Sequence, residues 1–247
     1  MAEWIPGRVL DREVWSSGLY TLHISARVAP FTAGQFVRLA LDIGDERVAR
    51  PYSVISPPDA ENVEVLFNEV PGGPLSGRLA LLEPGQSVWV TRQPAGLFTL
   101  AAVPDVTDLW LMATGTGIGP YLSMLRTEEF RSRFERVVLV HAVRSRGDLV
   151  YRDWLESLAA ESRRRFTYLP VTSRERTDFS LPGRIPDLVS SGDLEVRADL
   201  RLSAGRSHVM LCGNQAMIRD TIDILGERGM QRHLRSKPGH ITTEKYH

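Results

Sequence analysis

The chain has 247 residues, of which 43% are hydrophobic and 24% are charged. A globular protein of this size buries about 75% of its unfolded surface, so its stability requires neither disulfides nor metals. Thirty basic and thirty acidic side chains cancel, which argues against general binding to nucleic acid or to an anionic membrane. The single cysteine, Cys212, excludes a disulfide within the chain and an iron–sulfur cluster held by the usual four cysteines.

The N-terminal segment, MAEWIPGRVLDRE, lacks the basic region followed by an apolar stretch that marks a secretory signal. No apolar run approaches the ~20 residues of a membrane-spanning helix. We therefore expect a cytoplasmic enzyme or binding protein that does not associate with membranes. A monomer is the default expectation, and no metal site is predicted.

From Arg8 to about Leu100 the sequence consists of short segments with strand-like patterns, separated by glycine, proline or aspartate. Regular short strands of this kind predict an antiparallel sandwich or barrel. The predicted strands are residues 8–15, 19–26, 35–41, 52–56, 63–70 and 87–93.

After Pro104 the pattern changes to near-continuous apolar runs, which are typical of buried parallel strands. Strands alternating with helix-like segments predict a doubly wound α/β domain. The boundary is expected near Ala101 to Asp105, giving domains of residues 1–101 and 102–247. The predicted strands are 108–113, 136–143, 165–171 and 207–213, and the predicted helices are 119–130, 150–162, 183–192 and 214–229.

The stretch RPYSVIS, Arg50 to Ser56, places a guanidinium, a phenol and a hydroxyl at the start of a predicted strand. These groups suit contacts with a phosphate, with a flat ring and with a hydrogen-bonding atom. The alternative is a charged strand end whose aromatic residue lies on an exposed face. The stretch alone leaves both interpretations open.

A glycine-rich turn, GTGIGP, lies between a predicted buried strand and a predicted helix. Such a turn brings main-chain N–H groups and a helix N-terminus close to an anion, usually a phosphate. Pro120 suits the first turn of a helix, where its missing N–H has no intrahelical partner to lose. The spacing of Gly115, Gly117 and Gly119 differs from the dinucleotide fingerprint, so a tight turn without a ligand remains an alternative.

Arginines follow the next two predicted strands of the second half. The first of these strands leads into Arg144 and Arg146, with no acidic residue before Asp148, and the second leads into Ser173 and Arg174. An acidic residue at such a position suits the ribose hydroxyls of NAD, whereas arginine suits the 2′-phosphate of NADP. Arginine and serine together make a suitable phosphate clamp, so the pattern favours NADPH over solvated loop arginines.

Seven motifs in collinear order resemble the ferredoxin–NADP reductase family, specifically the bacterial ferredoxin/flavodoxin–NADP reductases. The resemblance spans the whole chain. It implies a two-domain fold, with a six-stranded antiparallel β-barrel that binds FAD followed by a doubly wound parallel α/β domain that binds NADP(H). The motifs are RPYS, GGPLSGRL, GTGIGPYLSML, SRE, GRIP, LCGNQAMIRD and GHITTEKYH.

The resemblance also implies roles for individual residues of the first half. Arg50 would contact the FAD pyrophosphate, Tyr52 would stack on the isoalloxazine ring, and Ser53 would hydrogen-bond near flavin N5. The turn around Leu75 and Ser76 would close over the pyrophosphate. The complete set implied for FAD in this half is Arg50, Pro51, Tyr52, Ser53, Phe67, Leu75 and Ser76.

For the second half, the resemblance implies an NADP(H) site. Thr116 and Gly117 would meet the pyrophosphate. The adenosine end and its 2′-phosphate would be held by Arg144, Ser173, Arg174 and Arg184.

The C-terminal tail would reach the flavin. Cys212 would lie beside the nicotinamide, Glu244 would help with charge balance or proton supply, and Tyr246 would cover the flavin face opposite Tyr52. With Ser53, these three residues form the predicted catalytic set. Where similar reductases end in a tryptophan that stacks on the FAD adenine, this chain ends in His247, whose smaller ring is expected to stack less strongly.

The implied activity is hydride transfer between NADPH and FAD and single-electron transfer between FAD and ferredoxin or flavodoxin. These carriers are acidic, so docking is expected to use a basic surface. Two stretches are candidates, Ser162–Phe166 and Arg232–Lys237, and the second is favoured because it precedes the tail.

Two other functions compete with this interpretation. One is an NAD(P)H reductase of free flavins, quinones or dyes, or the reductase of an oxygenase with a separate carrier, since one cysteine excludes a fused iron–sulfur domain. The other is a flavin-binding redox sensor or regulatory subunit. Preference for NADPH and turnover with an acceptor discriminate between them.

Overall fold

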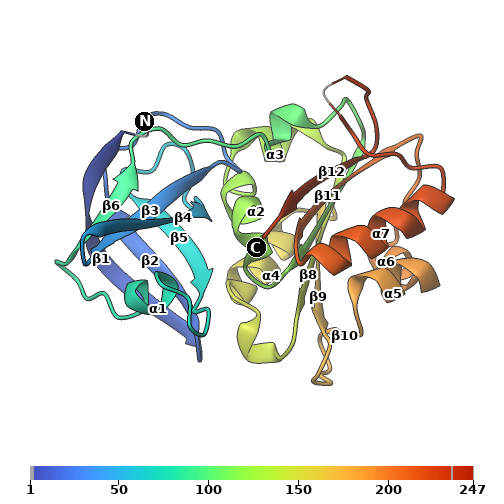
Figure 1. Ribbon diagram of the computed structural model, residues 1–247. Coiled ribbons are helices and arrows are strands. Elements are labelled where there is room, and N and C mark those ends of the chain that lie inside the picture. The colour runs from blue at the N-terminus through green and yellow to red at the C-terminus, as the bar shows by residue number, and fades with distance from the viewer. Residues whose placement is uncertain (1–2, 235, 247) are drawn as a thin grey trace. The chain divides into compact units, whose positions relative to one another are not determined.

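The computed structural model describes residues 3–234 and 236–246, and the chain divides into two compact units. The first unit comprises Met1–Leu100 and Gly119–Phe130, and the second comprises Ala101–Ile118 and Arg131–His247. Figure 1 shows the strands of the first in blue to blue-green and those of the second from green to red. Within the described residues, no helix has both the length and the apolar character that a bilayer span requires.

A six-stranded antiparallel sheet forms the first unit, in the order β4-β3-β6-β1-β2-β5. Its edge strands meet beyond the end of β4, where Val54 bridges Val65 and the Ile55 N–H donates to the Glu64 carbonyl oxygen at 2.9 Å. The sheet therefore closes into the predicted barrel. The strands are β1 (Trp4–Ser16), β2 (Leu19–Ser25), β3 (Phe36–Ile43), β4 (Glu46–Ser53), β5 (Val63–Asn68) and β6 (Ser87–Thr91).

Two helices complete the first unit. The short α1 (Ser76–Leu79) contributes Leu79 to the apolar core of the barrel. Beside α2 (Gly119–Met124), the Ser123 hydroxyl donates to the Ser56 carbonyl oxygen at 2.8 Å, and Arg126 donates to the Ile55 carbonyl oxygen at 2.9 Å. The helix that follows the glycine-rich turn is thus fastened to the segment after β4.

A six-stranded parallel sheet forms the second unit, in the order β10-β9-β8-β7-β11-β12. The chain moves outward from β7 to β10, then returns to place β11 on the other side of β7. This confirms the predicted doubly wound fold and puts its switch point between β7 and β11. The strands are β7 (Asp108–Thr114), β8 (Arg136–Val143), β9 (Phe166–Thr172), β10 (Leu181–Pro182), β11 (Ser207–Gly213) and β12 (Ile241–Lys245).

Helices cover both faces of the parallel sheet (Figure 1). On one face, α5 (Ile185–Ser191), α6 (Asp193–Ala198) and α7 (Gln215–Glu227) share an apolar core with alternate residues of β8 and β9, such as Val138 and Leu169. On the other face, α4 (Arg152–Glu161) packs against β9. Buried apolar residues therefore point to both sides, which explains the near-continuous apolar runs in the sequence.

The structure differs from the sequence-based expectations at several element boundaries. The predicted helix 119–130 is broken into α2 and α3 (Glu128–Arg133), because the Thr127 hydroxyl donates to the Met124 carbonyl oxygen at 2.7 Å and accepts from the Phe130 N–H at 3.3 Å. The predicted strand 52–56 is also wrong at both ends. Its place is taken by β4, which starts at Glu46 in a charged stretch. The sequence pattern did not predict α6, β10 or β12.

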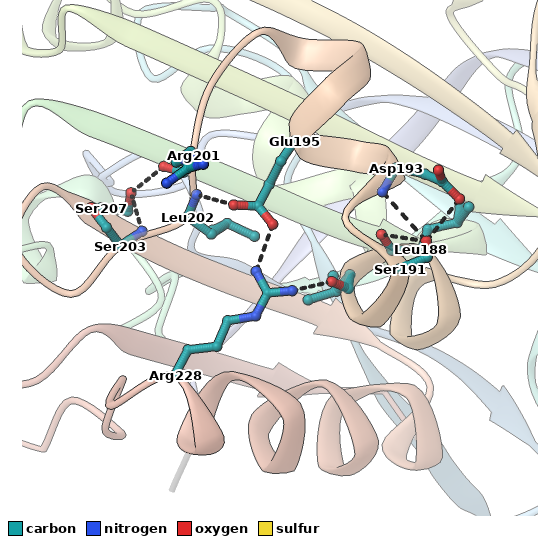
Figure 2. A network of polar contacts seen from close by, with 10 residues as sticks. Leu188, Ser191, Asp193, Glu195, Arg201, Leu202, Ser203, Ser207 and Arg228 are labelled. Atoms are coloured by element: carbon teal, nitrogen blue, oxygen red, sulfur yellow. Dashed lines mark hydrogen bonds and ion pairs between the residues drawn. The ribbon is translucent and has the colours of Figure 1, made fainter.

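A polar network connects α5, α6 and α7 (Figure 2). The Glu195 carboxylate accepts from Arg228 at 2.6 Å and from the Leu202 N–H at 2.9 Å, and Arg228 also donates to the Val189 carbonyl oxygen. Both charged side chains are mostly buried, with exposed fractions of 17% for Glu195 and 28% for Arg228. The pair therefore ties the end of α7 to the two helices beside it.

Replacing Glu195 should destabilise the second unit. We expect Glu195→Ala to lower the free energy of unfolding by about 2–3 kcal/mol, because it leaves a half-buried guanidinium and a main-chain N–H without their acceptor. Denaturant unfolding measures the change. The control, Glu227→Ala, removes an exposed carboxylate beside Arg228 and should change stability by less than about 0.5 kcal/mol. Equal stabilities of the two variants would contradict the role of the pair.

Candidate functional site

The residues predicted for NADP(H) lie together at one edge of the parallel sheet. Thr116 and Gly117 follow β7, Arg144 follows β8, and Ser173 follows β9. Cys212 pairs with Glu244 near the ends of β11 and β12. Because parallel strands present their carboxyl ends at one edge, the fold brings these residues of distant sequence positions to one side of the sheet.

Two glycines shape the glycine-rich turn in different ways. Gly115 has a φ of +54°, and a Cβ atom there would meet nothing within 4 Å, so the main chain on that side borders open space. Gly117 is the opposite case. A Cβ atom on Gly117 would lie 2.6 Å from the Cys212 carbonyl oxygen and 2.9 Å from the Gly213 Cα, so only glycine fits against β11.

Hydrogen bonds from main-chain N–H groups to side chains also hold the switch point together. The Thr114 hydroxyl accepts from the Asn214 N–H at 2.8 Å, which joins the end of β7 to the start of α7. The Asn214 side chain in turn accepts from the N–H groups of Ala216 and Met217, at 2.9 and 3.2 Å, as an N-cap. The turn and the N-terminus of α7 are therefore fixed relative to each other.

Main-chain hydrogen bonds between the ends of β8 and β9 position the residues that are predicted to bind the adenosine end of the nucleotide. The N–H of Ser173 donates to the Val143 carbonyl oxygen at 3.0 Å, and that of Arg174 donates to the Arg144 carbonyl oxygen at 2.9 Å. Arg144, Arg174 and Arg184 all have exposed side chains. The structure thus places arginines of two strand ends beside each other, in the arrangement that a phosphate clamp requires.

An ion pair that the sequence did not reveal lies in the same place. Glu175 accepts from the Arg146 N–H at 2.8 Å, and its carboxylate lies 3.1 Å from the Arg146 guanidinium. An acidic residue among the arginines would weaken a phosphate site. Because Arg146 neutralises Glu175, the remaining arginines keep a net positive charge at this edge.

Cys212, which is buried, lies beside the partly buried Glu244 and Tyr246 at the tail. The Tyr246 N–H donates to the Gly213 carbonyl oxygen at 3.1 Å, which extends the pairing of β11 and β12 beyond Lys245. Burial raises the pKa of Glu244 to about 7. Burial, and then the charge of Glu244, raises the pKa of the Cys212 thiol, so this cysteine stays protonated at neutral pH and is no thiolate nucleophile.

The residues predicted for FAD gather around the end of β4 in the first unit. Tyr52 is partly buried and meets the edge of the Phe67 ring from β5, with ring centroids 5.9 Å apart. Ser53 is buried, whereas Arg50 and Pro51 are exposed. Burial raises the pKa of Tyr52 to about 12, so its phenol is neutral at physiological pH.

The GGPLSGRL turn closes onto the end of β5. The Ser76 hydroxyl accepts from the Val70 N–H at 2.9 Å, and Leu75 is buried in the barrel core. Gly72 has a φ of +71°, and a Cβ atom there would meet nothing within 4 Å. The turn is therefore anchored at Leu75 and Ser76 and leaves open space on the side of Gly72.

Comparisons with known proteins agree along the whole chain. Two family models match, the oxidoreductase FAD-binding domain over residues 14–99 and the oxidoreductase NAD-binding domain over residues 111–223. The chain is 47% identical to a flavodoxin/ferredoxin–NADP reductase of Shigella flexneri and 46% identical to one of Escherichia coli K12, each over 100% of both chains. The chain belongs to the flavodoxin/ferredoxin–NADP reductase family.

A solved structure gives the same result. A ferredoxin–NADP+ reductase from Neisseria gonorrhoeae, determined with bound FAD and NADP, matches with a TM-score of 0.94 and 32% identity over 99% of each chain. Membership of this reductase family confirms the predicted fold, enzyme class and cofactors. The roles of individual residues stay predictions.

The residues present fit both cofactors of the reductase family. The open side of Gly115 and the exposed arginines suit a dinucleotide phosphate, and the partly buried face of Tyr52 beside a buried Ser53 suits a flavin ring. No group of three or more candidate metal ligands occurs among the described residues. His247, which was predicted to contact FAD, lies outside the described residues.

Sequence reasoning also missed His141, a buried histidine of β8 whose Nε2 lies 3.1 Å from the Gly115 carbonyl oxygen. The signal was present, since a polar residue interrupts the apolar run RVVLVHAV. Only the strand pairing shows that this side chain reaches the glycine-rich turn.

The raised pKa of Glu244 predicts a pH-dependent stability. An unfolded carboxyl ionises near pH 4.5, whereas the folded one stays protonated until about pH 7, so Glu244 destabilises the fold progressively as the pH rises between these values. Glu244→Gln should match the unmodified protein near pH 4.5 and exceed its unfolding free energy by about 3 kcal/mol at pH 8.

Denaturant unfolding with saturating FAD at both pH values measures this difference. The exposed Glu227→Gln serves as the control and should follow the unmodified protein at each pH. A stability difference for Glu244→Gln that does not change with pH would contradict the assignment.

Proposed function

We propose that the chain catalyses electron transfer between NADPH and ferredoxin or flavodoxin, with FAD as the intermediate carrier. One observation carries the proposal: over its whole length the chain is 47% identical to a reductase named for both protein carriers. The neighbouring structure with bound FAD and NADP supports the same cofactor pair. A cytoplasmic location and a monomeric state are part of the proposal.

The chain's own residues position the reactants. FAD, when bound, would supply the chemistry that links two-electron hydride transfer with NADPH to single-electron transfer with the carrier. Tyr52 provides an aromatic face for the flavin, and Ser53, its neighbour at the end of β4, is the buried hydroxyl that we assign to flavin N5. In the second unit Glu244, with a pKa of about 7, exchanges a proton near physiological pH. Hydride transfer depends above all on contact geometry, which is why no nucleophile is needed.

The charge of the carboxyl edge supports NADPH as the reductant. Arg144, Arg174 and Arg184 expose their side chains there, and Glu175, an acidic residue among them, is paired with Arg146. Guanidinium groups bind the 2′-phosphate of NADPH by charge-assisted hydrogen bonds, whereas NADH has only a hydroxyl at that position. The site therefore favours NADPH.

An anaerobic absorbance titration tests this function directly. The purified protein should show a flavin spectrum that one equivalent of NADPH bleaches quickly and one equivalent of NADH bleaches slowly. In the matched variant Arg174→Ala, the rate of flavin bleaching by limiting NADPH should fall at least about tenfold, while the rate with NADH should change little. The reason is that the lost charge-assisted hydrogen bond weakens binding only of the nucleotide that carries the 2′-phosphate.

Other outcomes separate the competing functions. A flavin that neither nucleotide bleaches would favour the sensor. Rapid bleaching by both nucleotides, with turnover of free flavin or quinone but not of a carrier protein, would favour a general reductase. A colourless protein that cannot be reconstituted with FAD would contradict the assignment.

Both predicted docking stretches, apart from Arg235, which lies outside the described residues, are at the amino edge of the parallel sheet, opposite the predicted NADP(H) residues. Ser162–Phe166 leads into β9. Leu234 and Lys237 exchange main-chain hydrogen bonds of 2.9 and 3.0 Å in a hairpin that precedes β12 (Figure 1). Tyr246 lies beyond the other end of β12, five residues or about 16 Å away. Proximity in sequence to the tail therefore does not mean proximity in space to Tyr246, the tail residue that we propose to reach the flavin.

We expect docking charges to lie outside these stretches. Reduction of an acidic ferredoxin or flavodoxin should slow with rising ionic strength, because salt screens attraction between charged surfaces. Arg164→Glu and Lys237→Glu should each leave the rate within about twofold of the unmodified protein at low salt. A larger loss in either variant, with unchanged reduction of a neutral quinone, would place docking at that stretch after all.

A further inference from the structure

The side chain of His141 lies beneath the glycine-rich turn. His141 is fully buried in β8, where it pairs with Ala113 of β7, and its Nε2 lies 3.1 Å from the Gly115 carbonyl oxygen. A carbonyl oxygen only accepts, so Nε2 carries the hydrogen and Nδ1 is the bare nitrogen. No sequence motif pointed to a role for this residue.

Burying a histidine at this position costs free energy that an apolar side chain would not. The other residues of β8 from Val137 to Val143 are apolar, and His141 Nδ1 is buried without a hydrogen-bond partner among the described residues. An aliphatic side chain would fill the space without burying an unsatisfied nitrogen. Burial lowers the pKa of His141 to about 4, so the ring is neutral at physiological pH and brings no positive charge to the site. What the ring does bring is one hydrogen-bond donor aimed at the turn.

That donor fixes the orientation of the peptide between Gly115 and Thr116. In a trans peptide the C=O and the following N–H point in opposite directions, and no cis peptide occurs in the described chain. Because the Gly115 carbonyl oxygen points to the buried His141, the Thr116 N–H points away from it, to the side where Thr116 is partly exposed.

The peptide needs such an anchor. Gly115 has a φ of +54° and no Cβ atom, and nothing lies within 4 Å of the place where a Cβ atom would stand. Glycine adopts alternative φ and ψ values easily, so the peptide is able to rotate. After such a rotation the Gly115 carbonyl oxygen would face the anion, where the Thr116 N–H should stand, and would repel it.

We propose that His141 is a positioning residue for dinucleotide binding, which holds the Gly115–Thr116 peptide with its N–H directed at the pyrophosphate. The inference rests on the proposed function, since it assumes that NADP(H) binds at this turn. It assigns His141 to the pyrophosphate alone and not to the adenosine 2′-phosphate, whose predicted residues lie at the ends of β8 and β9. This division makes it testable.

Two ligands separate the two parts of the site. NADP+ carries both the pyrophosphate and the 2′-phosphate, whereas adenosine 2′-monophosphate carries only the latter. In the FAD-loaded protein, His141→Leu should raise the dissociation constant of NADP+ about tenfold and leave that of adenosine 2′-monophosphate within about twofold. His141→Gln places an amide nitrogen where Nε2 stood and should restore NADP+ binding to within about threefold of the unmodified protein.

Calorimetric titration of all three proteins measures these constants. Equal weakening of both ligands in His141→Leu, or no weakening of either, overturns the inference while the proposed function stands. Failure of the unmodified protein to bind NADP+ overturns the proposed function, and this inference with it.

A measurement on the unmodified protein avoids reliance on a folded variant. Nitrogen NMR of the histidine rings should show His141 with its hydrogen on Nε2 and without titration between pH 5.5 and 8. Adding NADP+ should shift the Thr116 N–H resonance, and adding adenosine 2′-monophosphate should not. A hydrogen on Nδ1, or equal shifts with both ligands, overturns the inference.

Discussion

The close packing of Gly117 against the main chain of Cys212 and Gly213 is the constraint on which the nucleotide half of this protein depends. No side chain fits there, because even a Cβ atom would lie 2.6 Å from a carbonyl oxygen. The packing draws the turn after β7 onto the end of β11, at the switch point of the sheet. Thr114 and Asn214 secure the same contact, so the turn and the N-terminus of α7 form one rigid structure.

The charged side chains along this edge of the sheet differ from one end to the other. Glu175 would oppose a phosphate, yet Arg146 pairs with it and leaves the other arginines of the edge to act on a ligand. Further along the edge, burial keeps the Cys212 thiol protonated and brings the pKa of Glu244 to about 7. In the proposed site, the end assigned to the 2′-phosphate therefore exposes arginines, whereas the end assigned to hydride transfer holds a neutral thiol.

Fold class was predictable from the sequence because the period of the apolar residues changes after Pro104. Alternating short segments imply an antiparallel sheet with one buried face, and continuous apolar runs imply strands buried on both faces. The boundaries were less predictable. A hydroxyl of Thr127 breaks one predicted helix into two, and β4 begins in a charged stretch that is stabilised by pairing with β3 rather than by its own apolar pattern.

The family, the cofactors and the residue types at the strand ends could be inferred before the fold was known, since they follow from local motifs in a collinear order. The contacts of each side chain could not, because they depend on how the strands pair. Arg146 pairs with Glu175 and His141 reaches Gly115 because neighbouring parallel strands bring distant positions within hydrogen-bonding distance. Conversely, the hairpin at Lys237 lies far from the tail that follows it, because the extended residues of β12 separate the two.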